Sequence, residues 1–186
     1  MSMGCGRGEY SVKMAKIFPD RNFLGVDIKG ARIWKGAKTA LENEVKNVGF
    51  IRTRIDFIES FFSRDEVGEI WITFPDPHLK KARKRLTSAK FLNMYKDFLR
   101  ADGVIHLKTD NAELFNYTLE IAKLNKLDVE YSSDNIYGRP LQDKVLDIKT
   151  YYEKMWLEKG LNIHYLRFKL NCNHVIKELP DIKKGR

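Results

Sequence analysis

Residues 4–27 read GCGRGEYSVKMAKIFPDRNFLGVD, and this segment contains the pattern that indicates the architecture. It begins with glycines at alternate positions, which can adopt positive φ and let a ligand approach the backbone closely. The next residues, 10–17, can form a helix whose N-terminus would face that ligand. Residues 22–27 then have the apolar character of a short buried strand. The segment therefore predicts a glycine-rich turn, a helix and a strand at a ligand-binding edge.

The spacing of the glycines separates two classes of ligand. A dinucleotide-binding fingerprint needs Gly-x-Gly-x-x-Gly, whereas Gly4, Gly6 and Gly8 form Gly-x-Gly-x-Gly, with Glu9 where the fingerprint would have its third glycine. The observed spacing suits S-adenosylmethionine and makes a nicotinamide oxidoreductase the least favoured class. Asp27 ends the following strand, where a carboxylate can accept hydrogen bonds from both ribose hydroxyls of an adenosine ligand. An exposed aspartate that caps the next helix is the alternative for this residue.

The rest of the chain alternates between strand and helix patterns. We expect strands at residues 48–52, 68–74, 102–108, 126–132 and 161–170, and helices at residues 31–45, 88–100 and 111–124. Strands separated by helices form βαβ units and a mostly parallel sheet. We therefore predict an α/β, Rossmann-like fold with helices on both faces of the sheet. Ligands of such sheets bind at the carboxyl ends of the strands.

The composition excludes several classes of protein. The 186 residues include 34 Lys and Arg against 25 Asp and Glu, which gives a formal net charge of +9. A hydrophobic share of 43% is too high for a disordered chain, and no apolar run reaches the roughly 18 residues of a membrane span. Cys5 and Cys172 form no disulfide framework, and the four histidines have no metal-ligand spacing. We expect a cytoplasmic protein without a membrane or metal partner. Its charge favours nucleic acid as a partner, with plain solubility as the alternative.

Two side chains follow the strand expected at residues 48–52. Asp56 could accept a hydrogen bond from the amino group of an adenine, and Phe57 could offer a face to its ring. Taken alone, these two residues are better explained as part of an ordinary loop.

A second loop, Phe74-Pro75-Asp76-Pro77, follows the central strand pattern GEIWIT. The two prolines restrict the backbone around Asp76, so its carboxylate is held stiffly over the expected site. A rigid turn with an exposed aspartate is the alternative. Five of the six residues 80–85 are Lys or Arg. A charge run is usually a solvated face, but beside the expected site it favours contact with phosphates.

Six motifs occur along the chain in the order GCGRGEY, GVDI, RIDF, TFPDPHLKKARKRLTSAKF, IHLKTDN and TYYEKMWLEKG. Together they resemble the bacterial tRNA (guanine-N7)-methyltransferases, from residue 3 to about residue 170. The resemblance implies a class I methyltransferase fold with an antiparallel last strand. It also implies S-adenosylmethionine as methyl donor and the variable-loop guanosine at position 46 of tRNA as acceptor.

The resemblance further implies the residues of the site. Asp76 is the implied catalytic residue, lying near both cofactor and base. The implied cofactor-binding residues are Gly4, Gly6, Gly8, Asp27, Ile28, Asp56, Phe57 and Asp76. The implied substrate-binding residues are Lys80, Asp110, Thr150, Tyr151, Tyr152 and Glu153.

This chain departs from the family pattern in three places. His78 stands where the family usually has Trp, the basic loop is about two residues shorter, and Ser2 stands where the family has an acidic residue before the first glycine. Family members also carry further residues upstream. We therefore expect residues 1–186 to be a single methyltransferase domain that lacks an N-terminal extension and most of the first strand.

Guanine N7 carries a free lone pair, so methyl transfer needs no prior removal of a proton and depends on proximity and orientation. We expect Asp76 to position the guanine, Asp110 and Glu153 to stabilise its growing positive charge, and Thr150 to add a hydroxyl contact. Two alternatives stay open: a catalytically weak tRNA-binding module, and a methyltransferase that acts on a small molecule or a protein. The oligomeric state, monomer or homodimer, is also open.

Overall fold

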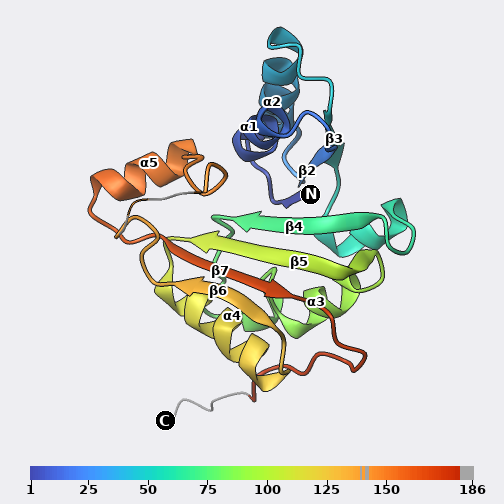
Figure 1. Cartoon of the computed structure of the whole chain (residues 1–186), viewed down its shortest axis with the longest axis vertical. Helices are drawn as coiled ribbons and strands as arrows, with labels where there is room; N and C mark the ends of the chain where they lie inside the picture. Colours follow the sequence, from blue (N-terminus) through green and yellow to red (C-terminus); the bar gives the residue numbers. More distant parts are fainter. Residues whose placement is uncertain (139, 141–142, 181–186) are drawn as a thin grey trace.

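The computed structural model describes residues 1–138, 140 and 143–180 (Figure 1). Its strands are β1 Ser2–Met3, β2 Phe23–Asp27, β3 Val48–Arg52, β4 Val67–Thr73, β5 Leu99–Thr109, β6 Val129–Ser133 and β7 His164–Lys169. Its α-helices are α1 Glu9–Ile17, α2 Gly30–Glu42, α3 Ala89–Tyr95, α4 Ala112–Leu124 and α5 Tyr151–Glu158. Two 3-10 helices, η1 Ile55–Phe61 and η2 Ala82–Lys84, lie in the loops on either side of β4.

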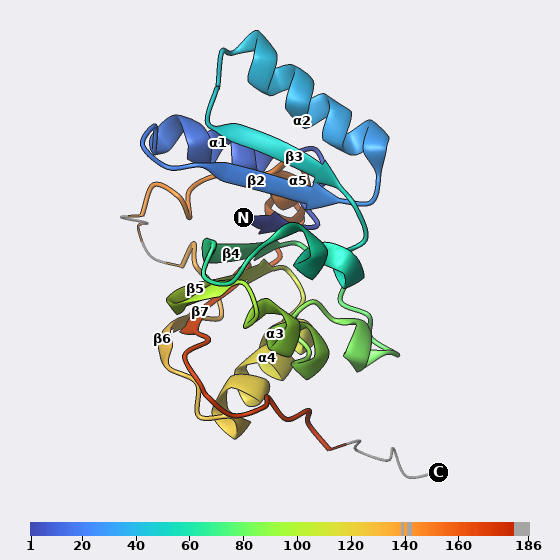
Figure 2. The ribbon, with the colours of Figure 1, turned by 90° about the vertical axis from the view of Figure 1, so that its right-hand side faces the viewer.

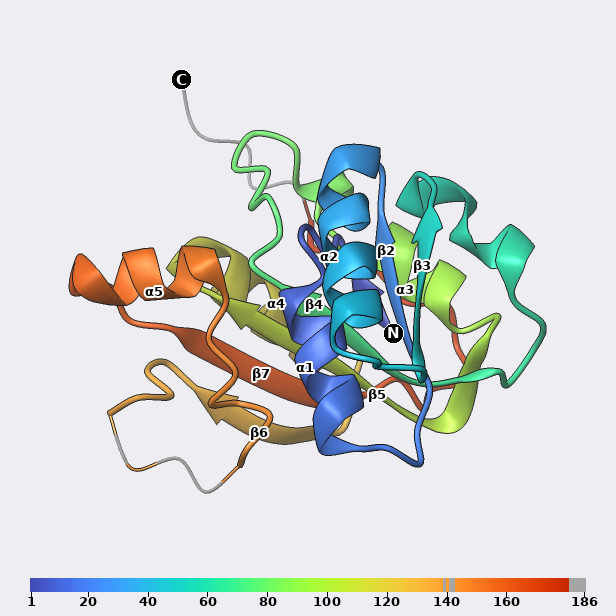
Figure 3. The same cartoon turned by 90° about the horizontal axis from the view of Figure 1, so that it is seen from above.

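The strands of the described residues form one seven-stranded sheet in the order β3-β2-β1-β4-β5-β7-β6 (Figure 2). All pairs among β1 to β5 are parallel, whereas β7 runs antiparallel to both β5 and β6. The sheet twists strongly, as parallel sheets do, so that β2 and β3 run steeply across the direction of β5 and β7 (Figure 3). This arrangement confirms the predicted fold class.

The two faces of the sheet have separate cores. Neighbouring residues of a strand point to opposite faces, and β4 shows this directly. Ile70 and Ile72 belong to the core that includes Leu92 of α3 and Ile121 of α4. Trp71 belongs to the other core, with Tyr10 of α1 and apolar side chains between residues 136 and 148. Helices therefore cover both faces, as the βαβ pattern predicts.

Two predicted helices are too long, and one α-helix was not predicted. The helix expected at residues 31–45 ends at Glu42. The helix expected at residues 88–100 ends at Tyr95, and β5 begins at Leu99. The reason is tertiary: Leu99 pairs with Val67 of β4, and the Val67 N–H donates to the Phe98 carbonyl at 3.0 Å. The unpredicted helix is α5, which lies where β4 and β5 end (Figure 1).

Candidate active site

A cavity of about 510 Å³ opens at the carboxyl ends of β1 and β2, a size typical of small-molecule pockets. One wall comes from the glycine turn, the end of β2 and the start of η1. The other wall comes from the loop after β4 and from α3. Its lining includes Gly4, Asp27, Ile28, Asp56, His78 and Lys90. The cavity therefore lies where parallel sheets bind their ligands.

The glycine turn needs its glycines for two different reasons. Gly4, Gly6 and Gly8 have φ of 69°, 55° and 68°, values that residues with a side chain rarely adopt. A Cβ on Gly8 would also lie 2.5 Å from the Phe50 ring. A Cβ on Gly6 would meet nothing within 4 Å. The turn is thus packed tightly behind Gly8 and open beside Gly6.

Asp27 ties the glycine turn to the end of β2. Its Oδ2 accepts a hydrogen bond from the Gly6 N–H at 2.8 Å, and its Oδ1 accepts one from the Lys29 N–H at 2.9 Å. The side chain is buried, so the alternative of an exposed helix cap is wrong. An ionised carboxylate offers about four acceptor positions. Two positions therefore remain for hydroxyl donors in the cavity that Asp27 lines.

Asp56 joins the two walls of the cavity. Its carboxylate is 2.5 Å from Nζ of Lys90 on α3 and 3.4 Å from the guanidinium of Arg54. The hydrogen bond from Lys90, supported by the charges of Lys90 and Arg54, holds the pKa of Asp56 below its usual range against the smaller effect of burial. Phe57 is exposed, lies 5.6 Å from the Arg54 guanidinium and is not part of the cavity lining.

The Phe-Pro-Asp-Pro loop leaves β4 with an unusual backbone. Phe74 and His78 have positive φ of 51° and 43°, and such strain is often found at functional sites. Asp76 Oδ1 accepts a hydrogen bond from the His78 N–H at 3.0 Å. The Asp76 side chain is 72% exposed, and it is His78 that lines the cavity. The loop therefore holds the Asp76 carboxylate beside the cavity and open to a ligand.

The basic segment contains two kinds of cation. Its exposed members are Lys80, Lys81, Arg83 and Lys84. The Arg85 side chain is only 4% exposed. Its Nε donates to the Pro77 carbonyl at 2.9 Å, and its Nη2 pairs with Glu113 of α4 at 2.5 Å. Arg85 therefore anchors the Phe-Pro-Asp-Pro loop to α4, which corrects the expectation that this cation offers its charge to phosphates.

Asp110 lies next to the same loop because of the sheet. It directly follows β5, and the Phe74 N–H at the end of β4 donates to the Lys108 carbonyl of β5 at 2.8 Å. Asp110 is half-buried. The cap of α4 is Asn111, whose side chain accepts from the Leu114 N–H at 2.8 Å. The capping role therefore does not fall to Asp110.

The Thr150–Glu153 element forms the first turn of α5. Thr150 Oγ1 accepts from the Glu153 N–H, and the Glu153 carboxylate accepts from the Thr150 N–H, which is a capping box. Glu153 is fully buried and pairs with Lys108. Tyr151 and Tyr152 stay exposed.

The same turn of α5 lies beside the glycine turn. The N–H of Tyr151 donates to the Glu9 carboxylate at 3.1 Å. The Arg7 guanidinium lies 4.9 Å from the centre of the Tyr151 ring. The segments expected to bind substrate are therefore close to those expected to bind cofactor.

Comparisons with known proteins give the family. A family model described as putative methyltransferase matches residues 1–166. The tRNA (guanine-N(7)-)-methyltransferase of Bacteroides thetaiotaomicron is 51% identical over 183 residues, which cover 98% of this chain and 72% of that protein. This chain belongs to the tRNA (guanine-N(7)-)-methyltransferase family. The member from Porphyromonas gingivalis is 48% identical over 184 residues, covering 98% of this chain and 75% of its own length.

Solved structures support the fold of this methyltransferase family member. A crystal structure of a SAM dependent methyltransferase from Aquifex aeolicus superposes with a TM-score of 0.62 at 12% identity. The match covers 91% of this chain and 80% of that one. The predicted family and the class I methyltransferase fold are thus confirmed.

In this family member, the predicted site residues fall into three groups. Those lining the cavity are Gly4, Asp27, Ile28 and Asp56. Those in the loops and helix start at the same edge of the sheet are Gly6, Gly8, Asp76, Lys80, Asp110, Tyr151 and Tyr152. Those with side chains engaged elsewhere are Phe57, Thr150 and Glu153.

Three cations shape the methyltransferase site in ways that were not predicted from the sequence: Lys90, Arg85 in its anchoring role, and Lys108. None of the three gives a clear signal. Lys108 lies in IHLKT, whose alternation of apolar and polar residues is typical of a strand with one exposed face. Across residues 1–138, 140 and 143–180, no helix is long and apolar enough to span a membrane. In the same residues, no group of three or more His, Cys, Asp or Glu side chains could hold a metal ion.

Proposed function

We propose that this chain transfers the methyl group of S-adenosylmethionine to N7 of a guanosine in tRNA. The guanosine is position 46, in the variable loop, and the reaction takes place in the cytoplasm. The observation that carries the proposal is the cavity at the glycine turn, which opens beside the exposed lysines and Arg83 of the loop after β4. The family relationship supports the same reaction.

The cavity residues fit the cofactor. Gly4 lines the cavity, and the space beside Gly6 is open. A side chain at position 6 would occupy space that is free for the cofactor. Asp27 keeps two acceptor positions for the ribose hydroxyls, and Asp56 is an ionised acceptor on the wall where the adenine amino group would lie. When bound, S-adenosylmethionine supplies a methyl group on a positively charged sulfur.

The proposed reaction needs no general base. Guanine N7 attacks with its own lone pair, so orientation and charge stabilisation are the main contributions of the protein. Asp76, exposed beside the cavity, positions the guanine, and its carboxylate can accept hydrogen bonds from N1–H and the 2-amino group. Asp110 adds negative charge near the base as its positive charge develops.

The remaining substrate contacts come from the basic segment and from α5. Lys80 and its exposed neighbours contact phosphates, while Tyr151 and Tyr152 offer exposed rings at the same edge. The Thr150 hydroxyl and the Glu153 carboxylate are turned into the helix start. In this proposal they act on α5 itself.

The test is methyl transfer from labelled S-adenosylmethionine to an unmodified tRNA transcript, beside a transcript in which the variable-loop guanosine is replaced. Label on the first transcript alone is the expected result. Label on both would refute the position, and label on neither would refute the reaction. A thermal shift with S-adenosylhomocysteine then distinguishes a chain that binds the cofactor from a module that binds only tRNA.

A further inference from the structure

Lys108 is a charged residue in the protein interior. It lies near the end of β5, and neither its side chain nor that of Glu153 has any exposed surface. The Lys108 ammonium is 2.7 Å from Glu153 Oε1, and it donates to the carbonyls of Leu146 and Ile148 at 2.7 and 3.2 Å. An ammonium has three donors. The Tyr137 hydroxyl oxygen lies 3.4 Å from the ammonium as a fourth, longer contact. All three donors of Lys108 therefore have acceptors inside the protein.

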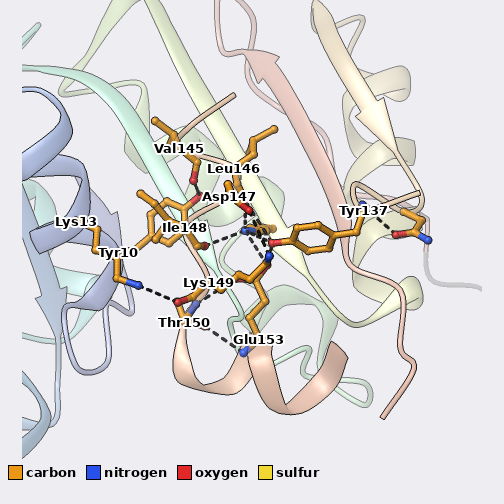
Figure 4. Close-up of polar contacts among 12 residues, drawn as sticks. Tyr10, Lys13, Tyr137, Val145, Leu146, Asp147, Ile148, Lys149, Thr150 and Glu153 are labelled. Carbon is orange, nitrogen blue, oxygen red and sulfur yellow. Dashed lines mark hydrogen bonds and ion pairs between the residues drawn. The ribbon is translucent and has the colours of Figure 1, made fainter. Parts of the chain in front are cut away.

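The carboxylate of Glu153 is equally occupied. The Tyr137 hydroxyl donates to Oε1 at 2.7 Å, and the Thr150 N–H donates to Oε2 at 3.3 Å. Figure 4 shows Leu146, Ile148, Glu153 and Tyr137 converging on one spot from different segments. We define the Lys108 cluster as Lys108, Glu153, Leu146, Ile148 and Tyr137.

Two further contacts, made by α1, hold the segment that leads into α5. The Tyr10 hydroxyl of α1 donates to the Val145 carbonyl at 2.7 Å, and Lys13 Nζ donates to the Lys149 carbonyl at 3.1 Å (Figure 4). Residues 143–150 are therefore held between β5 and the helix that follows the glycine turn.

Neither charge of the pair can be removed alone without consequence. A buried charge that loses its partner is strongly unfavourable, whereas replacing both charges together is often tolerated. Burial lowers the pKa of Lys108, and Glu153 acts against that effect. A single replacement would leave one buried charge without its partner, and that charge would be stabilised only by contact with water. Leu146, Ile148 and the first turn of α5 would have to move to let it reach the surface.

We infer that Lys108 and Glu153 are positioning residues for the RNA substrate. Glu153 has no surface through which a nucleotide could touch it, so it acts through the segment it fixes. The pair sets the start of α5 beside the glycine turn and so presents Tyr151 and Tyr152 at the site. This inference rests on the proposed function. It replaces two expectations: that Glu153 binds the substrate, which the family resemblance implies, and that Glu153 stabilises the charge on guanine.

A double-mutant cycle tests this role. The variants are Lys108→Met, Glu153→Gln and the two combined, because Gln also supports a capping box. The readouts are kcat and KM for tRNA, the Kd for S-adenosylhomocysteine, and hydrogen exchange of residues 143–158. Each single variant should lose about 100-fold in kcat/KM, mainly through KM for tRNA, with the cofactor Kd changed less than about threefold. The double variant should recover to within about tenfold of wild type.

Direct contact between Glu153 and guanine gives a different pattern. Under that mechanism the double variant binds S-adenosylhomocysteine normally but stays at least as inactive as Glu153→Gln, and this result would overturn the inference. If the single variants do not fold, Tyr137→Phe serves as the mild perturbation, since it removes one hydrogen bond to Glu153. It should raise KM for tRNA about fivefold, and an unchanged KM would also overturn the inference.

The proposed function and the inference fail in distinguishable ways. Wild-type protein that methylates no tRNA refutes the function. The positioning role is then still measured by hydrogen exchange, in which residues 143–158 lose protection in the single variants and regain it in the double variant. Unchanged protection in the single variants would refute that role.

Discussion

Replacing Arg85 by leucine should loosen the Phe-Pro-Asp-Pro loop from α4. The Arg85 side chain is 4% exposed and donates to the Pro77 carbonyl at 2.9 Å. A hydrogen bond from a charged donor contributes about 1.5–3 kcal/mol. The guanidinium also lies 4.4 Å from the centre of the buried Tyr117 ring, a contact that adds about 1–2 kcal/mol when desolvated. Glu113 is 58% exposed, so its ion pair adds at most about 1 kcal/mol.

Because such contributions overlap, Arg85→Leu should lower the free energy of unfolding by about 3 kcal/mol in total. For a chain of this size that corresponds to a Tm lower by about 6–12 °C. The assay is urea and thermal denaturation of the wild type and the variant. Arg83→Leu is the matched control, because it removes the same charge from an exposed position, and its stability should change by less than about 0.5 kcal/mol.

The two arginines should also differ in their effect on RNA. Arg83→Leu should reduce the salt dependence of tRNA binding by up to about 0.9 in the log–log slope, as expected for a lost phosphate contact. Arg85→Leu should leave the slope unchanged. An Arg85 variant that keeps full stability and shows the slope change of the Arg83 variant would refute the anchoring role.

Three further predictions follow from other parts of the structure. Gly8→Ala should lower Tm more than Gly6→Ala, because of the two only Gly8 would place its new Cβ 2.5 Å from a ring. Equal losses of Tm would contradict this reason. Gly6→Ala should instead weaken the binding of S-adenosylhomocysteine, measured by calorimetry. Burial, helped by the charge of Arg167, lowers the pKa of His106 from 6.5 to about 3. Between these two pH values the folded state binds fewer protons than the unfolded state, so stability falls as the pH drops from 6.5 toward 3. His106→Phe should reduce the fall in urea midpoint between pH 7 and pH 5, whereas a variant of the exposed His174 should not. Asp76→Asn should lower kcat more than it weakens cofactor binding, and equal losses would argue against a role in positioning the guanine.

Local sequence patterns were sufficient to predict those elements whose pattern is compatible with only one kind of secondary structure. The strand predicted at residues 48–52 is β3 without a shift, because its apolar run is bounded by polar residues. The pattern at residues 88–100 has two meanings. Phe98 and Leu99 continue the helical spacing of Phe91 and Tyr95, yet Leu99 starts β5 because it pairs with Val67. Only the tertiary contact distinguishes the two.

The same limit applies to the site. Thr150-x-x-Glu153 matches both a family motif and a capping box. The prediction rested on the family motif, so α5, which the capping box begins, was not predicted. The buried Arg85 is indistinguishable in the sequence from its exposed neighbours, since all belong to one run of cations. Burial is a property of the assembled fold, so roles that depend on it cannot be assigned from residue type and spacing.

The contacts around the start of α5 also have a consequence for the order of folding. The Tyr10 hydroxyl bond to Val145 joins residues 135 positions apart in the chain. Closing so long a loop costs entropy before its contacts contribute. The parallel strands, which are closer in sequence, should therefore assemble first, and residues 143–158 should dock onto an already formed sheet. Contacts formed after the transition state slow unfolding and leave the folding rate unchanged. The side chains that hold α5 should thus govern how long the folded enzyme persists more than how quickly it forms.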